Sequence, residues 1–277
     1  MPGGAAGVSR SPDPGQLHRI VLTPNEVRGD DVLLSAANTH HVREVLRLRH
    51  RAFVRGLVAE SGPSARYDLL LRLEDNWEGR LHCLVVGRVE LPPDPRLAIT
   101  VGQGLTRGER FEYTLQKCTE IGAAEIVPLL TERTVVRPES VERTQRLARW
   151  QRIVEEAALQ SGRGSIPAIG DPVKLTDFAG QCAGVPADLR LVAYESERGA
   201  LHTVLASMRR QGIVPLAAQI VIGPEGGLAS REVDCLVEAG FTPVSLGPRI
   251  LRTETAGPLL TALLLYEFAD LGGPGGA

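Results

Sequence analysis

The 277-residue chain lacks the segments that would place it in several large protein classes. No run approaches the roughly 18 uncharged apolar residues that a membrane-spanning helix needs, and the longest apolar run, 259–265, is far too short. The cysteines, Cys83, Cys118, Cys182 and Cys235, include no close pair. A zinc knuckle and a CxxC redox motif are therefore excluded, and four scattered thiols are typical of a reduced, cytoplasmic protein.

Lysine is scarce, and the charges nearly cancel. The sequence has 31 Lys and Arg residues against 33 Asp and Glu residues, a formal net charge of −2, and its only lysines are Lys117 and Lys174. A basic field over the whole protein is excluded, so a nucleic acid partner would have to be bound by local patches. Because the abundance of Arg, Ala, Gly and Pro also indicates GC-rich coding, we consider where the arginines lie and not how many there are.

The N-terminal third is organised differently from the rest. Residues 1–16 are rich in Gly, Pro, Ser and Ala, and this composition predicts a disordered N-terminal lead. They lack the apolar segment of a secretory signal. Residues 17–91 predict a small β-rich domain, and three prolines within 92–95 predict a linker. Strands are expected near 19–22, 54–58, 67–73 and 81–89, with one helical stretch over 39–48.

From residue 96 to 271, strand-like runs alternate with amphipathic helix-length runs, and residues 272–277 read as a flexible tail. Such alternation predicts an α/β domain with a parallel sheet and helices on both faces. Ligands bind such sheets beyond the carboxyl ends of strands, so the loops after Ala193, Gly223 and Leu246 are candidate ligand loops. Strands are expected near 97–101, 125–130, 189–193, 219–223 and 243–246, and helices near 109–121, 141–161, 200–210, 231–239 and 259–269.

The loop over 222–228 reads IGPEGGL and has neither GxGxxG spacing nor a following Gly-Lys-Ser/Thr. It is therefore neither a dinucleotide fingerprint nor a P-loop. Its glycines allow close approach of the backbone to a ligand, although a tight strand-to-helix turn is an equally good reading. The carboxylate of Glu225 would repel phosphate and favours a cationic or hydroxyl-bearing ligand.

The loop over 246–256 reads LGPRILRTETA and places five polar or charged side chains in seven positions. Helix capping accounts for part of this pattern: Thr253 or Thr255 caps the following helix, and Glu254 meets its positive end. Arg252 is a cation at the wrong end of a helix. It is either a solvated side chain or a group that meets an anion or a substrate carbonyl, and the neighbouring glycine-rich loop favours the second reading.

These two loops together resemble the C-terminal signature of the SPOUT methyltransferases, specifically the RsmE family. Further segments resemble that family in the same order: RGERFE at 107–112, QKCTEIG at 116–122, ERT at 132–134, WQRI at 150–153 and QSGR at 160–163. The HHVREVLR segment at 40–47 resembles its N-terminal domain, whereas 48–56 departs from the family's usual turns. The resemblance implies a trefoil-knotted SPOUT domain preceded by a small PUA-like β-barrel, and a homodimer.

The resemblance also implies a reaction, the S-adenosylmethionine-dependent methylation of uridine N3 in 16S rRNA, at uracil-1498 in the decoding region of the 30S subunit. Arg252 would stabilise charge on the uracil oxygens and Glu254 would be the base, unless Glu254 serves only the helix start. The motif implies no metal site. The residues implied for the cofactor are Tyr194, Glu195, Gly223, Glu225, Gly226, Leu246, Gly247, Ile250, Leu251, Arg252 and Thr253.

The RNA contacts implied by the motif match are Arg43, Arg47, Arg107, Lys117 and Arg163. The arginines that recur every third residue over 143–152 are read as a solvated helix face. Two alternatives stay open: a related SPOUT enzyme with a different RNA target, which the divergent 48–56 segment favours, and a non-catalytic RNA-binding ribosome-assembly factor. Mapping of the methylated base and titration with S-adenosylmethionine discriminate among them.

Overall fold

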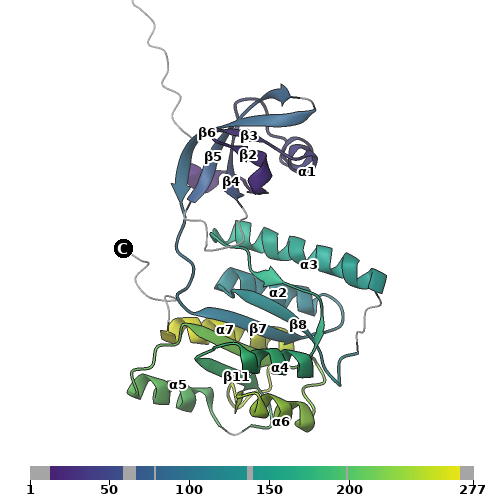
Figure 1. Cartoon of the computed structure of the whole chain (residues 1–277), viewed down its shortest axis with the longest axis vertical. Coiled ribbons are helices and arrows are strands. Elements are labelled where there is room, and N and C mark those ends of the chain that lie inside the picture. Colours follow the sequence, from purple (N-terminus) through teal and green to yellow (C-terminus); the bar gives the residue numbers. More distant parts are fainter. Residues whose placement is uncertain (1–12, 59–66, 78, 136–139, 198, 269–277) are drawn as a thin grey trace, which may run out of the picture. The chain divides into compact units, whose positions relative to one another are not determined.

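The computed structural model describes residues 13–58, 67–77, 79–135, 140–197 and 199–268 (Figure 1). The chain divides into two compact units, Met1–Pro93 and Asp94–Ala277, which are described separately below. Most of the lead predicted over 1–16 and all of the tail predicted over 272–277 lie outside the described residues. Within the lead predicted over 1–16, Pro14–Gln16 form the 3-10 turn η1. The Pro14 carbonyl accepts a hydrogen bond from Arg55 Nη1 at 3.3 Å.

The first unit is built on one mixed sheet in the order β1-β4-β5-β6-β3-β2. β1 and β4 pair in parallel, and the other neighbours pair antiparallel. Strands β2 and β3 were not predicted, because strands of two and three residues are too short to show a periodic pattern. The strands are β1 (Arg19–Leu22), β2 (Val27–Arg28), β3 (Asp31–Leu33), β4 (Phe53–Val58), β5 (Tyr67–Trp77) and β6 (Arg80–Glu90).

The helical stretch predicted over 39–48 is shifted toward the N-terminus. Helix α1 (Ala36–His40) begins where the Ser35 hydroxyl accepts from the backbone N–H of Asn38, and it continues as the π-helical turn η3 (His41–Val45). The helix cannot extend to residue 48, because Arg47 has a positive φ of 52°.

Two buried carboxylates organise the first unit. Glu26, at the end of the 3-10 turn η2 (Pro24–Glu26), is 2% exposed and accepts hydrogen bonds from the backbone N–H groups of Thr23 and Ser35 and from Asn38 Nδ2. Burial by itself raises the pKa of Glu26, but these hydrogen bonds lower it below its ordinary value.

The second carboxylate, Asp68, is fully buried between two guanidinium groups. The Nε atoms of Arg19 and Arg55 lie 2.6 and 2.8 Å from Asp68 Oδ2. Arg55 is therefore part of a buried ion pair and not an isolated surface cation.

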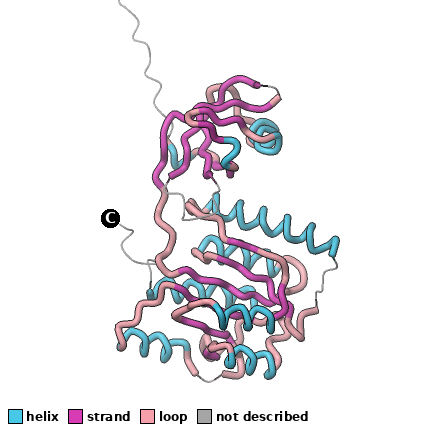
Figure 2. The backbone as a smooth tube through the Cα atoms, viewed as in Figure 1, coloured by secondary structure: helices cyan, strands magenta, loops and turns pink. Residues whose placement is uncertain are grey.

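The second unit contains a parallel sheet with helices on both faces, as the alternating sequence pattern predicted (Figure 2). The core between the sheet and α2, α3, α5 and α7 contains Phe111, Trp150 and Leu260, whereas the core toward α4 and α6 contains Phe178 and Leu236. The described strands are β7 (Ala98–Gly104), β8 (Glu125–Leu130), β9 (Ala168–Ile169), β10 (Val173–Lys174), β11 (Leu189–Ala193), β12 (Ala217–Ile222) and β13 (Thr242–Val244). The helices are α2 (Arg110–Ile121), α3 (Ser140–Gln160), α4 (Leu175–Gly184), α5 (Leu201–Arg210), α6 (Ser230–Glu238) and α7 (Thr253–Phe268).

Two helices differ from the sequence prediction. Helix α4 was missed, because its glycines lower its intrinsic helix propensity; burial of Leu175, Phe178, Ala179 and Cys182 at helical spacing stabilises it instead. Helix α7 begins at Thr253, six residues before the predicted start. The polar residues at its start precede the apolar run by which the rest of the helix was recognised.

The strand order β10-β8-β7-β12-β11-β13 brings the predicted ligand loops to one edge of the sheet. β13 lies beside β11 at the end of this order, yet α7 contacts α2, β7 and β12 near its middle. The segment between β13 and α7 therefore crosses back over the carboxyl ends of β11 and β12. This crossing places the LGPRILRTETA loop next to the GPEGGL loop.

Candidate active site

A cavity of about 510 Å³ lies at the carboxyl ends of β11, β12 and β13. The three loops that follow these strands enclose it, and Arg110 and Ala256 contribute from α2 and α7. Its size lies within the range of small-molecule sites. All eleven residues implied for the cofactor line this cavity: Tyr194, Glu195, Gly223, Glu225, Gly226, Leu246, Gly247, Ile250, Leu251, Arg252 and Thr253.

Close backbone packing holds the GPEGGL loop in place. A Cβ atom on Gly104, the last residue of β7, would lie 2.4 Å from the backbone nitrogen of Pro224. Gly227 has a φ of +67°, and a Cβ atom there would lie 2.6 Å from Glu195 Oε1. Gly104 is therefore required for the close approach of the backbone. Gly227 is required for close approach and also for its positive φ. Arg133 Nη1 donates to the Gly226 carbonyl oxygen at 2.8 Å.

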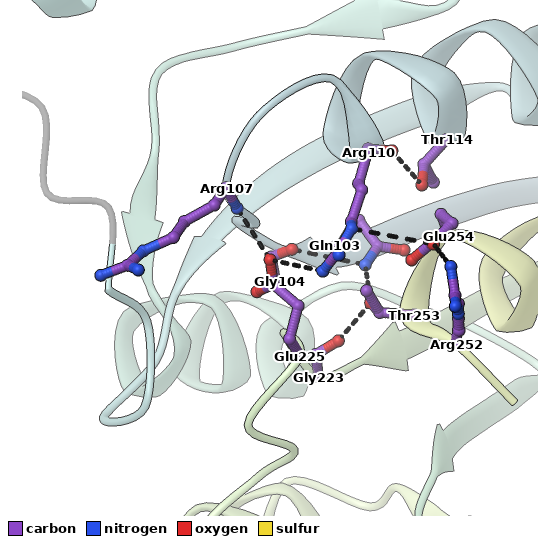
Figure 3. Close-up of polar contacts among 10 residues, drawn as sticks. All are labelled: Gln103, Gly104, Arg107, Arg110, Thr114, Gly223, Glu225, Arg252, Thr253 and Glu254. Carbon is purple, nitrogen blue, oxygen red and sulfur yellow. Dashed lines mark hydrogen bonds and ion pairs between the residues drawn. The ribbon is translucent and has the colours of Figure 1, made fainter. Parts of the chain in front are cut away.

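A buried hydrogen-bond chain joins three elements beneath the cavity (Figure 3). Gln103 Nε2, at the end of β7, donates to the Thr253 hydroxyl at 2.8 Å, and this hydroxyl donates to the Gly223 carbonyl oxygen at 2.6 Å. Gln103 is fully buried and Thr253 is 8% exposed. The prediction that Thr253 caps α7 was therefore wrong, because its hydroxyl is occupied by Gln103 and Gly223. The Arg252 carbonyl accepts from the N–H groups of Thr255 and Ala256 at the helix start.

Four charged side chains form an alternating row beside the cavity, with Arg110 between Glu225 and Glu254 (Figure 3). Arg110 Nη1 lies 3.3 Å from Glu225 Oε1, and its Nε lies 3.9 Å from Glu254 Oε1. Arg252 Nη1 lies 3.9 Å from the same Glu254 oxygen. Glu225 also accepts from the backbone N–H of Arg107 at 2.8 Å.

The two predicted catalytic side chains differ in their solvent exposure. The side chain of Arg252 is 81% exposed, whereas that of Glu254 is 15% exposed. The arrangement places an exposed cation next to a largely buried carboxylate, and Glu254 sits in the first turn of α7 as expected for a helix-start acid.

A second, more open cavity of about 980 Å³ adjoins the first. Arg107, Tyr113, Arg133 and Val135 line it, together with the charged row described above. The sequence reasoning missed Gln103, Arg110 and Tyr113 at this site. Their only signals were a glutamine at the end of an apolar strand run and the helical spacing of Arg110 and Tyr113.

The five residues implied for RNA contact lie in different settings. Arg43 and Arg47 are exposed in the first unit, and Arg107 is exposed at the second cavity. Lys117 Nζ pairs with Glu120 at 2.8 Å.

Arg163 is 8% exposed, and its guanidinium donates to the carbonyl oxygens of Thr119 and Ala123 at 2.9 and 2.7 Å. An RNA phosphate would have to displace these bonds. The guanidinium of Arg163 is therefore engaged in the interior and is not presented at the surface.

The cysteines are unpaired thiols in the structure. Burial raises the pKa of the Cys118 thiol to about 12, and Cys118 contacts Thr261 in the core and not the cavity. Within the described ranges, no group of three His, Cys, Asp or Glu side chains is arranged to hold a metal ion. In the same ranges, no helix is both long enough and apolar enough to cross a membrane.

A parallel α/β sheet with a small-molecule cavity over its carboxyl edge defines the class of α/β enzymes that bind ligands at this edge. Comparison with known proteins narrows the class. The family model described as RNA methyltransferase domain matches residues 92–265. The chain belongs to this RNA methyltransferase family, in the group represented by ribosomal RNA small subunit methyltransferase E.

Individual relatives agree along most of the chain. The ribosomal RNA small subunit methyltransferase E of Synechocystis sp. is 34% identical over 239 residues, which cover 86% of this chain and 74% of the relative. The structure of the Neisseria gonorrhoeae enzyme of that name, bound to S-adenosylmethionine, has a TM-score of 0.76 at 29% identity, covering 92% of this chain and 99% of that one. A Legionella pneumophila methyltransferase with bound S-adenosylmethionine has a TM-score of 0.80 at 28% identity, covering 92% and 100% of the two chains.

Proposed function

We propose that this protein methylates N3 of a uridine in 16S rRNA with S-adenosylmethionine as the methyl donor. The family's target, uracil-1498 in the decoding region, is the proposed position, and the 30S subunit is the proposed substrate. The observation that carries the proposal is that all eleven residues implied for the cofactor line one cavity. An enzyme with this substrate acts in the cytoplasm.

The cavity fits S-adenosylmethionine in size and in chemistry. Glu225 and Glu254 line it and favour a cationic sulfonium, and a carboxylate such as Glu225 can also accept hydrogen bonds from ribose hydroxyls. Leu246 and Leu251 offer apolar surface and backbone polar groups to the adenine, and Gly223 and Gly226 allow close approach on the methionine side.

The chain's own residues position the acceptor and manage its charge. When bound, S-adenosylmethionine supplies an electrophilic methyl group, and the electron pair of the broken S–C bond stays on sulfur as N3 forms its new bond. Arg252, exposed at the cavity, stabilises the negative charge that develops on the uracil oxygens. Glu254 accepts the N3 proton, and the guanidinium groups of Arg110 and Arg252, each 3.9 Å away, hold its carboxylate in place.

The finer architecture is also part of the proposal. The return of α7 to β7 and β12, fixed by the Thr253 bond to Gly223, supports a trefoil knot in the second unit. The mixed sheet of the first unit supports a PUA-like domain, and exposed Arg43 and Arg47 supply it with cations for RNA. Arg107 and Lys117 extend the RNA contacts to the second unit.

A homodimer is proposed from the exposed side of α7. Leu259, Ala262, Leu263 and Tyr266 follow one another at helical spacing, and Leu263 and Tyr266 are 36% and 69% exposed. An apolar stripe of this kind marks an association surface. Sedimentation of the wild type and of Tyr266→Glu measures the oligomeric state, and a dimer that the charge dissociates is the expected result.

The activity is tested by incubating the purified protein with methyl-labelled S-adenosylmethionine and 30S subunits from a strain that lacks the modification. Mass spectrometry then maps the methylated nucleotide. Label at uridine N3 in the decoding region is the expected result, and label at another nucleotide would assign a different RNA target. Absence of both labelling and cofactor binding by calorimetry would favour the non-catalytic assembly factor.

A further inference from the structure

The two cavities of the second unit share a wall. Arg110, Glu225, Gly226, Arg252 and Glu254 line both the 510 Å³ cavity proposed for the methyl donor and the adjoining 980 Å³ cavity. Methyl displacement requires donor and acceptor to lie in contact and in line. The acceptor must therefore occupy a space that adjoins the donor cavity, and the second cavity meets this requirement.

Tyr113 distinguishes the second cavity from an ordinary polar groove. It lies one helical turn after Arg110 on α2, and its side chain is 50% exposed. Among the described lining residues of this cavity it is the one aromatic ring. Arg110, Tyr113 and Lys117 lie on one face of α2, and Lys117 Nζ is 5.9 Å from the centre of the Tyr113 ring.

Core packing gives no reason for an aromatic residue at this position. Helix α2 packs into the core through Phe111, Leu115 and Cys118, which are 2% exposed or less, whereas Tyr113 lies on the exposed side. Enzymes that modify a base extrude it into a pocket and stack it on aromatic or apolar side chains. Sequence-specific RNA recognition uses the same stacking of unpaired bases on aromatic rings.

We propose that the second cavity receives the acceptor uridine and that Tyr113 is the platform on which its base stacks. This inference rests on the proposed function. Stacking through the face of the base leaves its N3 edge free to meet Arg252 and Glu254 in the shared wall. Arg107 and Arg133 supply the same cavity with cations for the flanking phosphates.

The first test compares Tyr113→Ala with Tyr113→Phe, which keeps the ring, using 30S subunits that lack the modification. Stacking on one aromatic side chain predicts that the alanine variant loses about 5- to 150-fold in kcat/KM. The phenylalanine variant should remain within about threefold of the wild type, since the hydroxyl is not required for stacking. Calorimetry should show the same affinity for S-adenosylmethionine in both variants. Val237→Ala, which truncates an exposed apolar side chain on α6 outside both cavities, is the matched control.

The second test detects the contact without turnover. Ultraviolet irradiation of the wild type bound to the same subunits should join the stacked uracil to Tyr113. Trypsin cleaves after Arg110 and Lys117, so the adduct should appear by mass spectrometry on the peptide 111–117. If the wild type transfers methyl groups, Tyr113→Ala is fully active and no adduct appears on this peptide, the role of Tyr113 as a stacking platform is refuted. The proposed function would still stand in that case. No transfer by the wild type would overturn both.

Discussion

The buried chain Gln103–Thr253–Gly223 predicts the effect of one substitution in detail. Thr253→Val keeps the shape of the side chain but removes the hydroxyl that donates to Gly223 at 2.6 Å and accepts from Gln103 at 2.8 Å. The buried Gly223 carbonyl then loses this partner, and Gln103 Nε2 keeps only a long contact of 3.4 Å to the Gly104 carbonyl oxygen. Each unsatisfied buried group costs about 1–3 kcal/mol, so the second unit should lose roughly 2–6 kcal/mol.

Thermal unfolding measures this loss. At about 2–4 °C per kcal/mol for a unit of this size, the melting temperature should fall by at least about 4 °C. The chain has two tryptophans, so Trp150 fluorescence in a Trp77→Phe background reports on the second unit alone. Affinity for S-adenosylmethionine should fall as well, because Gly223 lines the cavity.

Two further variants make the reasoning refutable. Thr253→Ser keeps the hydroxyl and loses one methyl group, which costs about 0.5–1.5 kcal/mol, so it should be more stable than Thr253→Val. In a double-mutant cycle, Gln103→Leu should remove part of the penalty of Thr253→Val, with about 1–3 kcal/mol of coupling. Equal stability of Thr253→Val and wild type, or strict additivity in the cycle, would refute the role of the hydrogen-bond chain.

Three other substitutions give direct expectations. Arg252→Ala should abolish methyl transfer to 30S subunits and change the Kd for S-adenosylmethionine much less by calorimetry, because its guanidinium serves the acceptor although the residue also lines the cofactor cavity. Gly104→Ala should cost about 1–3 kcal/mol in urea unfolding and weaken cofactor binding, since its Cβ would meet Pro224 at 2.4 Å. Glu26→Gln should destabilise the first unit by about 2 kcal/mol at pH 7. The pKa of Glu26 is lowered in the fold, so the charged group contributes stability above its ordinary value of 4.5, and the difference should vanish as the pH falls through the lowered pKa.

Each of these has its own control. Retained turnover by Arg252→Ala would remove the charge-stabilising role. Gly170→Ala, where an added Cβ meets nothing within 4 Å, should behave as wild type beside Gly104→Ala. A gap between Glu26→Gln and wild type that stays constant from pH 7 to about pH 3 would contradict the hydrogen-bonded carboxylate.

Local sequence patterns determined much of the fold. The strands β8 and β11 have the predicted bounds, and the alternation of strands and helices predicted the parallel sheet with two covered faces. Periodicity works here because apolar side chains at spacings of 2 and 3.6 residues decide which face of each element is buried. The loops that enclose the cavity also followed from sequence, since the carboxyl ends of parallel strands lie at one edge.

Tertiary structure alone decided the elements and contacts that depend on distant parts of the chain. Helix α4 forms because its apolar side chains are buried in a core. The Thr253 hydroxyl bonds to Gln103 and Gly223, which lie 150 and 30 residues away in the sequence, and does not cap the helix that Thr253 begins. Arg163, which the motif match implies as an RNA contact, donates to carbonyl groups in the interior. Short-range patterns contain no information on such partners, because a polar side chain has the same local sequence whether its partner is water or a buried group brought near by the fold.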